Sequence, residues 1–147
     1  MTEKGRPELF LDEYREAFER FDVAAIAACF AFPLHVTGDA IDVTIVSVPT
    51  LEAWLPQLER IVGAYRMLRV ASADARDLRV VSVTSRIAQA TSNWHLLDVQ
   101  GEVIYDFHAS YTLADIGAGL RITVIAHDEG PRLLAAVARR QAASRIA

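Results

Sequence analysis

Four side chains in this sequence are the candidates for moving a proton in a catalytic site. His35 and Asp39 are candidate bases, and Tyr14 and Tyr111 are candidate hydrogen-bond donors. Removing a proton from a carbon beside a carbonyl needs one base and one donor to the oxygen, in a cavity that excludes water. Each candidate also has a structural interpretation. Asp39 could stabilise a turn after Gly38, His35 could bond a backbone carbonyl, and the tyrosines could be core residues.

Large apolar side chains predict where the walls of such a cavity would lie. The two tryptophans are typical of the walls of apolar ligand sites, although core packing explains them equally well. The predicted ligand-contacting residues are Phe18, Trp54, Leu58, Trp94, Tyr105, Phe107 and Tyr111. The expected ligand is therefore an apolar small molecule.

Other common site chemistries find little support in the sequence. Cys29 is the single cysteine and lies in an apolar stretch, which favours a buried structural thiol and excludes an internal disulfide. The four histidines show no close metal-ligand spacing, and no phosphate loop or nucleophile elbow occurs. We therefore expect neither a metal nor a cofactor.

The composition indicates one globular domain. The chain has 147 residues, of which 52% are hydrophobic and 23% charged, enough for an apolar core. All but one of the 15 basic residues are scattered arginines and the net charge is -4, which argues against nucleic acid as a partner. No apolar run suits a membrane span and the polar N-terminus has no signal segment, so a cytoplasmic location is expected.

Apolar residues at helical spacing predict three helices in the first half of the chain. One precedes Asp22, which is the expected N-cap of a second helix over 23–30 that ends before Pro33. The third follows an N-cap at Thr50, and Pro56 within it predicts a kink or a later start.

Period-two alternation predicts strands around and after these helices. Two short strands are expected at 34–37 and 42–48, with a turn at Gly38 and Asp39 between them. Long strands follow at about 68–84, 86–97, 102–114 and 120–127, and a peripheral Ala- and Arg-rich helix is expected over 131–146. Helices followed by antiparallel strands predict an α+β fold, with the helices on one side of a curved sheet.

Alternation along the last three strands separates the sheet into two faces. The apolar face, expected to pack against the helices, carries Ala88, Ala90, Trp94, Leu96, Tyr105, Phe107, Ala109, Tyr111, Leu113, Leu120, Ile122, Val124 and Ala126. The other face carries Gln89, Thr91, Asn93, His95, Asp106, His108, Ser110, Thr112, Arg121, Thr123, Ile125 and His127. This assignment assumes strands without bulges.

Three histidines, His95, His108 and His127, fall on the second face. They could form a metal or catalytic cluster, but a solvated or dimer-forming face is the favoured interpretation, because no element is expected to cover it. Ile125 and the low charge suggest that this outer face is partly buried, so we expect a homodimer through it. Residues 127–129, at the end of the last strand, are expected to be solvated.

Four short patterns together resemble the NTF2-like superfamily, in its SnoaL-like and ketosteroid-isomerase-like branches. They are Tyr14-x3-Phe18-x2-Phe21-Asp22-x3-Ile26-x3-Phe30, Asn93-Trp94-x6-Gly101, Tyr111-Thr112-Leu113 and Gly119-Leu120-Arg121-Ile122. The resemblance covers about Glu8 to Glu129. It implies a cystatin-like cone, in which a curved, mostly antiparallel sheet wraps on three N-terminal helices around a pocket, usually in a dimer. The domain would span residues 1–129, and 130–147 would form an extra C-terminal helix.

The catalytic residues of the isomerases carry over only in part. Tyr14 occupies the place of the tyrosine that donates to the substrate carbonyl. The place of the aspartate base falls at Gly38, with Asp39 one residue later. The place of a further acid falls near Ala109 and Ser110, where this sequence has none.

Two functions follow as hypotheses. The favoured one is a small-molecule-binding protein with an apolar aromatic pocket that performs cofactor-free acid/base chemistry, such as isomerisation, cyclisation or dehydration. Its catalytic residues would be Tyr14, Asp39 and His35. The alternative is a non-catalytic module for dimerisation or protein binding, whose cavity is filled by its own side chains.

Overall fold

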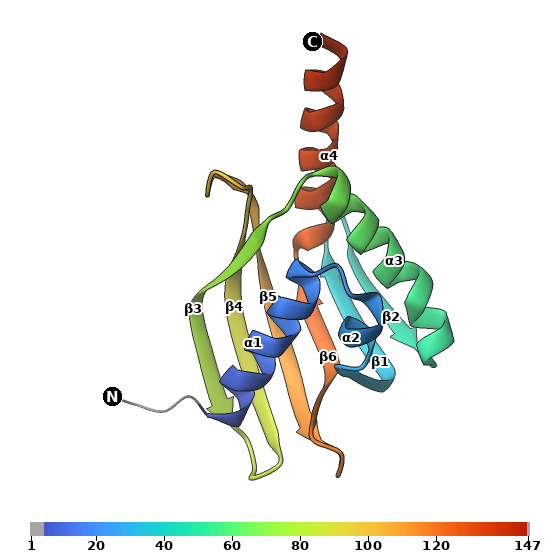
Figure 1. The fold of residues 1–147 in the computed structure, drawn as a ribbon. Helices are drawn as coiled ribbons and strands as arrows, with labels where there is room; N and C mark the ends of the chain where they lie inside the picture. The colour runs from blue at the N-terminus through green and yellow to red at the C-terminus, as the bar shows by residue number, and fades with distance from the viewer. Residues whose placement is uncertain (1–4, 147) are drawn as a thin grey trace.

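Helices and strands are combined in one fold in a computed structural model that describes residues 5–146 (Figure 1). Within those residues the helices are α1 (Arg6–Glu19), α2 (Val23–Ala27), α3 (Leu51–Met67) and α4 (Glu129–Ile146). The strands are β1 (Phe30–Asp39), β2 (Val43–Val48), β3 (Ser72–Ser82), β4 (Ile87–Leu97), β5 (Val103–Asp115) and β6 (Leu120–His127). The predicted α+β class is confirmed.

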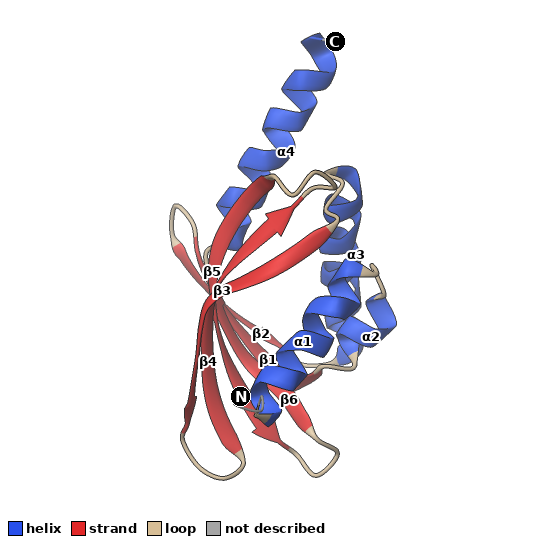
Figure 2. Ribbon diagram, turned by 60° about the vertical axis from the view of Figure 1, so that its left-hand side comes forward, coloured by secondary structure: helices blue, strands red, loops and turns tan. Residues whose placement is uncertain are grey.

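The six strands form one curved sheet in the order β2-β1-β6-β5-β4-β3. Neighbouring strands are antiparallel, apart from β1 and β6, which run parallel. Figure 2 shows α1, α2 and α3 on the concave side of the sheet. This arrangement confirms the predicted cone, in which the sheet wraps on the three N-terminal helices.

Polar side chains start α2 and α3 as predicted. Asp22 and Thr50 each accept a hydrogen bond from the backbone N–H three residues later, at 3.1 and 3.2 Å. These bonds supply acceptors for N–H groups that a helix leaves unpaired. The predicted later start of α3 is wrong, because the helix begins directly after Thr50 and continues through Pro56. The hydrogen bond lost at the proline is offset by burial of one face of the helix, formed by Trp54, Leu58, Val62 and Tyr65.

β1 begins earlier and ends later than predicted. The second helix stops before Phe30, and Pro33 lies within the strand. Gly38 and Asp39 pair with β2 and continue the strand, so the predicted turn at these two residues is wrong. Because β1 lies between β2 and β6, its backbone finds hydrogen-bond partners on both sides, and this outweighs the local turn propensity.

A β-bulge interrupts the alternation of β6. Leu113 of β5 pairs with Ile122, whereas the preceding residue, Thr112, pairs with Val124. Thr123 is therefore an extra residue between the two pairs. An extra residue in one strand reverses the side to which every later side chain points.

The bulge corrects the predicted faces at the end of β6. Ile125 is buried and His127 lines the interior, although both were predicted on the outer face. Val124 and Ala126 pair with outward-facing residues of β5, although both were predicted on the apolar face. The error follows from assuming an unbroken strand.

The core contains an aromatic cluster, which consists of Tyr14, Phe18, Phe30, Trp54, Tyr65 and Tyr111. Tyr14 is at its centre and meets Phe18, Phe30 and Tyr111 edge-on, with ring centroids 5.1 to 5.9 Å apart. Such edge-to-face pairs stabilise a core beyond the area they bury. The cluster joins α1 and α3 to the concave side of the sheet.

The last helix, α4, packs against the cone at its start and extends beyond it at its end. α4 packs against the core through Leu133, Ala136 and Val137, whereas Leu134 is exposed. The C-terminal part of α4 projects away from the sheet (Figure 1). The first residue of α4, in contrast, lies against the interior of the cone.

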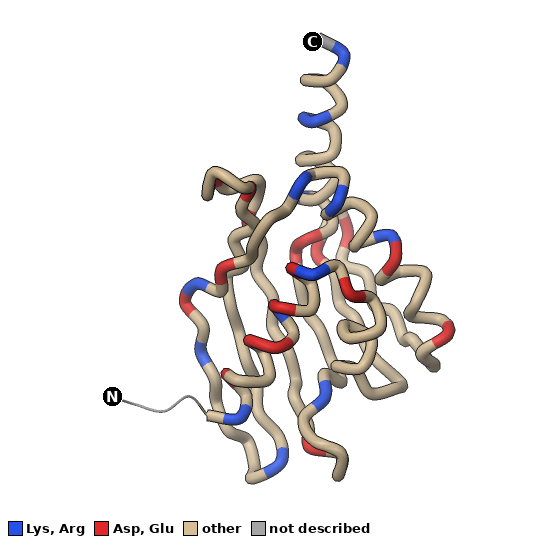
Figure 3. Tube along the Cα trace, in the orientation of Figure 1, with Lys and Arg blue, Asp and Glu red and all other residues tan. Residues whose placement is uncertain are grey.

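Charged residues are spread over the molecule. Figure 3 shows Arg, Asp and Glu on both the helices and the strands. None of the helices in the described part of the chain is apolar over enough residues to cross a lipid bilayer.

Candidate functional site

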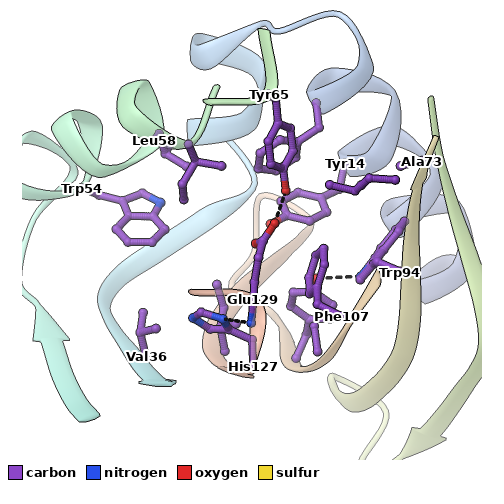
Figure 4. Close-up of a pocket in the computed structure, with 16 residues that line it drawn as sticks. Tyr14, Val36, Trp54, Leu58, Tyr65, Ala73, Trp94, Phe107, His127 and Glu129 are labelled. Atoms are coloured by element: carbon purple, nitrogen blue, oxygen red, sulfur yellow. Dashed lines mark hydrogen bonds between the residues drawn. The ribbon is translucent and has the colours of Figure 1, made fainter. Parts of the chain in front are cut away.

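A cavity of about 90 Å³ lies between the helices and the concave side of the sheet (Figure 4). Side chains of α1, α3 and α4 line it, together with side chains from every strand except β2. Most of the lining is apolar or aromatic. The polar groups that reach it are tyrosine hydroxyls, indole nitrogens, the His127 imidazole and the Glu129 carboxyl.

The structure brings most of the predicted ligand-contacting residues together. Those that line the cavity are Phe18, Trp54, Leu58, Trp94, Phe107 and Tyr111, and the predicted donor Tyr14 lines it as well. Tyr105 is buried but does not line the cavity. Its hydroxyl instead donates a hydrogen bond to Glu129, at 2.7 Å.

His35 and Asp39 lie outside the cavity. Both are exposed on β1, on the opposite side of the strand from Leu34 and Val36, which face the interior. Asp39 lines a groove of about 690 Å³ on the outer face of the sheet. The structure therefore does not bring these two predicted bases to Tyr14.

Glu129, the first residue of α4, supplies the carboxyl group in the cavity. Tyr65 and Tyr105 both donate hydrogen bonds to its Oε2 atom. Burial raises the pKa of Glu129, although the two tyrosine hydroxyls oppose this by stabilising the carboxylate. No described residue forms a hydrogen bond with Oε1, so this oxygen is available to a ligand.

The His127 imidazole is held in one tautomer. Its Nδ1 atom accepts a hydrogen bond from the backbone N–H of Glu129 at 3.0 Å, which places the proton of the neutral ring on Nε2. Burial lowers the pKa of His127, against the opposing effect of Asp128, and so favours the neutral ring. Nε2 points away from Glu129, toward the side where Val36 and Trp54 lie (Figure 4). A neutral N–H donor thus lies beside the carboxyl group.

Two small residues make room for His127. In the register of the sheet, His127 lies between Gly38 of β1 and Ala109 of β5. A Cβ atom on Gly38 would lie 3.8 Å from Nε2 of His127. Gly38 and Ala109 are the positions where the resemblance places the acids of the isomerases. Here His127 lies between them, and the carboxyl group comes from Glu129, two residues further along the chain.

A second hydrogen-bonded group lies on the β4–β5 side of the cavity. Trp94 Nε1 donates to the hydroxyl of Tyr111 at 2.9 Å. Burial raises the pKa of both Tyr14 and Tyr111, and the hydrogen bond between them adds to the rise for Tyr14 and opposes it for Tyr111. Both hydroxyls therefore keep their protons at neutral pH, and Tyr14 donates its proton to the hydrogen bond with Tyr111.

Cys29 and two of the histidines lie away from the cavity. Burial raises the pKa of the Cys29 thiol to about 11, in agreement with a structural role. His95 and His108 are on the outer face, where His108 Nδ1 lies 3.0 Å from the Asp128 carboxylate. In the part of the chain that the structure describes, no group of three or more His, Cys, Asp or Glu side chains is arranged to hold a metal ion.

Sequence reasoning missed Glu129. The interpretation of residues 127–129 as a solvated strand end is wrong, because Glu129 lines the cavity and is only partly exposed. Once the bulge at Thr123 is placed, Ile125, His127 and Glu129 follow one another at period two. This spacing is the signal that could have placed Glu129 on the same interior side as Ile125 and His127.

Glu129→Gln is expected to raise the melting temperature more at pH 8 than at pH 4. A carboxyl group whose pKa is raised by folding stabilises the fold below its ordinary pKa of 4.5 and loses that contribution as pH rises through the raised value. Glutamine does not ionise and still offers an oxygen to Tyr65 and Tyr105. We expect a gain of roughly 2–4 °C at pH 8, measured by calorimetry.

The matched control for this measurement is Glu102→Gln, which changes an exposed carboxylate. It should leave the difference between the two pH values as it is in the unaltered protein. Equal effects of Glu129→Gln at pH 4 and pH 8 would contradict the raised pKa.

The comparisons with known proteins agree with this fold. The profile of a family described as "NTF2-like protein (DUF6841)" matches residues 7–130. A comparison with curated protein sequences finds no significant match.

Solved structures show the same architecture at low identity. An NTF2-like protein of unknown function from Shewanella oneidensis MR-1 is 12% identical, with a TM-score of 0.65, and the match covers 84% of this chain and 96% of that one. Aln2 from a Streptomyces species is 14% identical, with a TM-score of 0.63 and coverage of 84% and 87%. A candidate ketosteroid isomerase from Shewanella frigidimarina NCIMB 400 is 12% identical, with a TM-score of 0.61 and coverage of 85% and 96%. At these identities the likeness establishes the fold alone.

Proposed function

Since the chain belongs to the DUF6841 family of NTF2-like proteins, we propose that it is a small-molecule enzyme that uses the interior of its cone as the site. The substrate is a mostly apolar ring compound with a carbonyl group. The reaction is a cofactor-free proton transfer beside that carbonyl, of which isomerisation of a ring ketone is the simplest case. This is one of the chemistries expected from the sequence, with Glu129 rather than Asp39 or His35 as the base.

The observation that carries the proposal is the Glu129 carboxyl group in an aromatic cavity. A carboxyl group brought among apolar side chains is costly unless it is paired, and here its partners are two tyrosine hydroxyls and no cation among the described residues. Its pKa is raised toward the range in which a general base works at neutral pH. Perturbed carboxyl groups of this kind cluster at functional sites.

The geometry supports a separate role for each oxygen of Glu129. Tyr65 and Tyr105 hold Oε2, which fixes the orientation of the carboxyl group. Oε1 then takes a proton from the carbon beside the substrate carbonyl and returns it to another carbon of the same substrate. The transfer is balanced, because the proton that leaves one carbon is the proton that the other carbon receives.

The charge that develops during this transfer needs a donor at the substrate oxygen. His127 provides Nε2–H as a neutral donor, in the tautomer set by the backbone N–H of Glu129. Tyr14, expected from the sequence to donate to the substrate, has its hydrogen bond with Tyr111 instead. In this proposal Tyr14 positions Tyr111, and both form the wall of the site.

The volume of the cavity limits the substrate to one ring. An apolar cavity of roughly 150 Å³ binds benzene, whereas this cavity has about 90 Å³, so even a single ring requires side chains to move. Val36 and Ile61 are only partly buried and also line a neighbouring groove of about 430 Å³ between β2 and α3. That groove, which Trp54 and His127 also line, is the proposed access route.

The test uses cyclohex-3-en-1-one, a single-ring ketone whose isomer cyclohex-2-en-1-one absorbs more strongly in the ultraviolet. We expect the purified protein to accelerate the conversion at pH 7 by at least about 100-fold over buffer, the lower limit of what one general base contributes. A rate equal to that in buffer would contradict the proposal.

A homodimer through the outer face of the sheet is a second part of the proposal. Val43 and Ile45 of β2 and Val81 of β3 are exposed on that face, at 64%, 82% and 63% of their surface. They lie at opposite edges of the sheet, on either side of the polar groove that contains His108 and Asp39. Exposed apolar side chains at both edges of one face can be covered by a second copy of the same face.

Sedimentation at micromolar concentration tests this part. We expect a species of twice the 16.2 kDa chain mass, and Ile45→Asp should shift it to the monomer while leaving the fold intact, because the side chain is exposed. A control change at an exposed apolar residue of α4, Leu134→Asp, should leave the dimer unchanged. A monomer in the unaltered protein would overturn the dimer.

A further inference from the structure

The indole N–H of Trp54 is a buried donor without a partner. Only 8% of Trp54 is exposed, and its Nε1 atom forms no hydrogen bond with any described residue. The other tryptophan is different, because Trp94 Nε1 donates to the Tyr111 hydroxyl at 2.9 Å. Buried polar groups in folded proteins are nearly always paired, so an unpaired donor in a cavity wall requires an explanation.

The side chains packed against Trp54 are apolar. Its ring packs edge-on against Phe30, with centroids 5.4 Å apart, and Leu58 lies one turn along the same helix. In Figure 4 the indole nitrogen lies on the side of the ring next to Leu58, and Trp54 and Leu58 both line the cavity. A molecule inside the cavity can supply an acceptor to this nitrogen.

The His127 imidazole is a second hydrogen-bond donor in this part of the cavity. Nε2 of His127 points toward Val36 and Trp54, and Trp54 and His127 line both the cavity and the neighbouring groove. Two N–H groups thus face the region next to the proposed access route. Neither ring provides an acceptor there, because the indole nitrogen only donates and the His127 acceptor, Nδ1, is occupied by the backbone N–H of Glu129.

We infer that Trp54 Nε1–H, with Nε2–H of His127, binds the carbonyl oxygen of the substrate, so that the cavity selects ring ketones over hydrocarbons of the same shape. The inference rests on the proposed function, because it needs a small molecule in the cavity. It adds the residue that makes the cavity select the carbonyl group. A hydrocarbon of equal size would leave the buried donor unpaired, and discrimination by such a group is larger than discrimination by shape.

The experiment compares cyclohexanone with methylenecyclohexane, in which a CH2 group replaces the carbonyl oxygen. Binding is followed in ¹H–¹⁵N spectra, where each tryptophan gives one indole N–H signal. Trp54→Phe and Trp94→Phe assign the two signals. Cyclohexanone is expected to shift the Trp54 indole proton downfield, whereas methylenecyclohexane is expected to leave it near its position in the free protein.

Affinity gives a second measurement. We expect the ratio of the affinities for cyclohexanone and methylenecyclohexane to fall by about 5- to 10-fold in Trp54→Phe, the effect of one hydrogen bond. Trp94→Phe is the matched control, because its indole is already paired, and it should keep the ratio of the unaltered protein. Taking a ratio removes the difference in hydration between the two compounds.

The outcomes separate this inference from the proposed function. If cyclohexanone shifts the methyl signals of Leu58 but not the Trp54 indole signal, the ketone binds without this donor. The inference is then overturned and the proposed function stands. If neither compound shifts any signal from the cavity, both are overturned. Because the spectra use the unaltered protein and Trp94→Phe alone can assign both indole signals, the result does not depend on the folding of Trp54→Phe.

Discussion

Replacing Glu129 with glutamine is expected to slow the isomerisation of cyclohex-3-en-1-one by about 10²- to 10⁴-fold, the usual contribution of a general base. The amide keeps the size of the side chain and an oxygen for Tyr65 and Tyr105, but it cannot take up a proton. The loss should therefore appear in kcat, with little change in KM. Initial rates from ultraviolet absorbance provide the measurement.

The pH dependence of the unaltered enzyme provides a further check on Glu129. Because the base must be ionised and burial raises the pKa of Glu129, kcat/KM is expected to rise with pH through a value above the ordinary 4.5. Glu102→Gln, which changes an exposed carboxylate, should keep the full rate and the same profile. A Glu129→Gln protein that retains more than a tenth of the rate would show that another group is the base.

Replacing His127 with phenylalanine is expected to lower kcat by about 10²- to 10³-fold, as the loss of one donor to a developing oxyanion does in other enzymes. Phenylalanine keeps a ring between Gly38 and Ala109 but has no N–H. The pKa of Glu129 should change little, since phenylalanine keeps the site buried and leaves the hydrogen bonds from Tyr65 and Tyr105 in place. The rate falls while the midpoint of the pH profile stays in place.

His127→Phe also distinguishes a donor from a base. Were His127 the base, its loss would remove the pH dependence together with the rate. Rates of the variant and the unaltered protein, measured from pH 4 to 9 with the same ketone, decide between the two roles. A variant with an unchanged rate would remove His127 from the mechanism.

The fold was predictable because its signals are local. The helix caps at Asp22 and Thr50 and the alternation of β4 and β5 each depend on neighbouring residues, and the structure agrees with them. The limits of β1 were not predictable in this way. Its pairing with β2 and β6 carries the strand through Pro33 and Gly38, both of which favour other conformations in isolation.

The bulge in β6 is the reason why the sequence did not predict the positions of His127 and Glu129. Leu120, Ile122, Val124 and Ala126 read as an unbroken apolar face, and nothing in their types marks Thr123 as the bulge. Ile122 and Ile125 are both buried although they are three residues apart, which indicates the bulge. The sequence alone does not show that both are buried, so it does not reveal the bulge. The bulge brings His127 to the interior, and with it Glu129.

Glu129 itself depends on partners far away in the chain. Tyr65 lies on α3 and Tyr105 on β5, and only the closed cone brings their hydroxyls to one carboxyl oxygen. In the sequence, Glu129 is the last of three polar residues at the end of a strand, the usual composition of a solvated end. The aromatic walls were predictable because apolar residues at regular spacing must be buried, whereas one buried acid gives no such pattern.

The central claim is that Glu129 is a buried carboxyl group with a raised pKa, poised to exchange a proton inside the cone. The most direct measurement is a pH titration of its side-chain carboxyl carbon by ¹³C NMR, with the signal assigned from Glu129→Gln. The account predicts a midpoint clearly above the ordinary glutamate value of 4.5. A midpoint at or below 4.5 would mean that Glu129 is an ordinary surface carboxylate, and it would contradict the site.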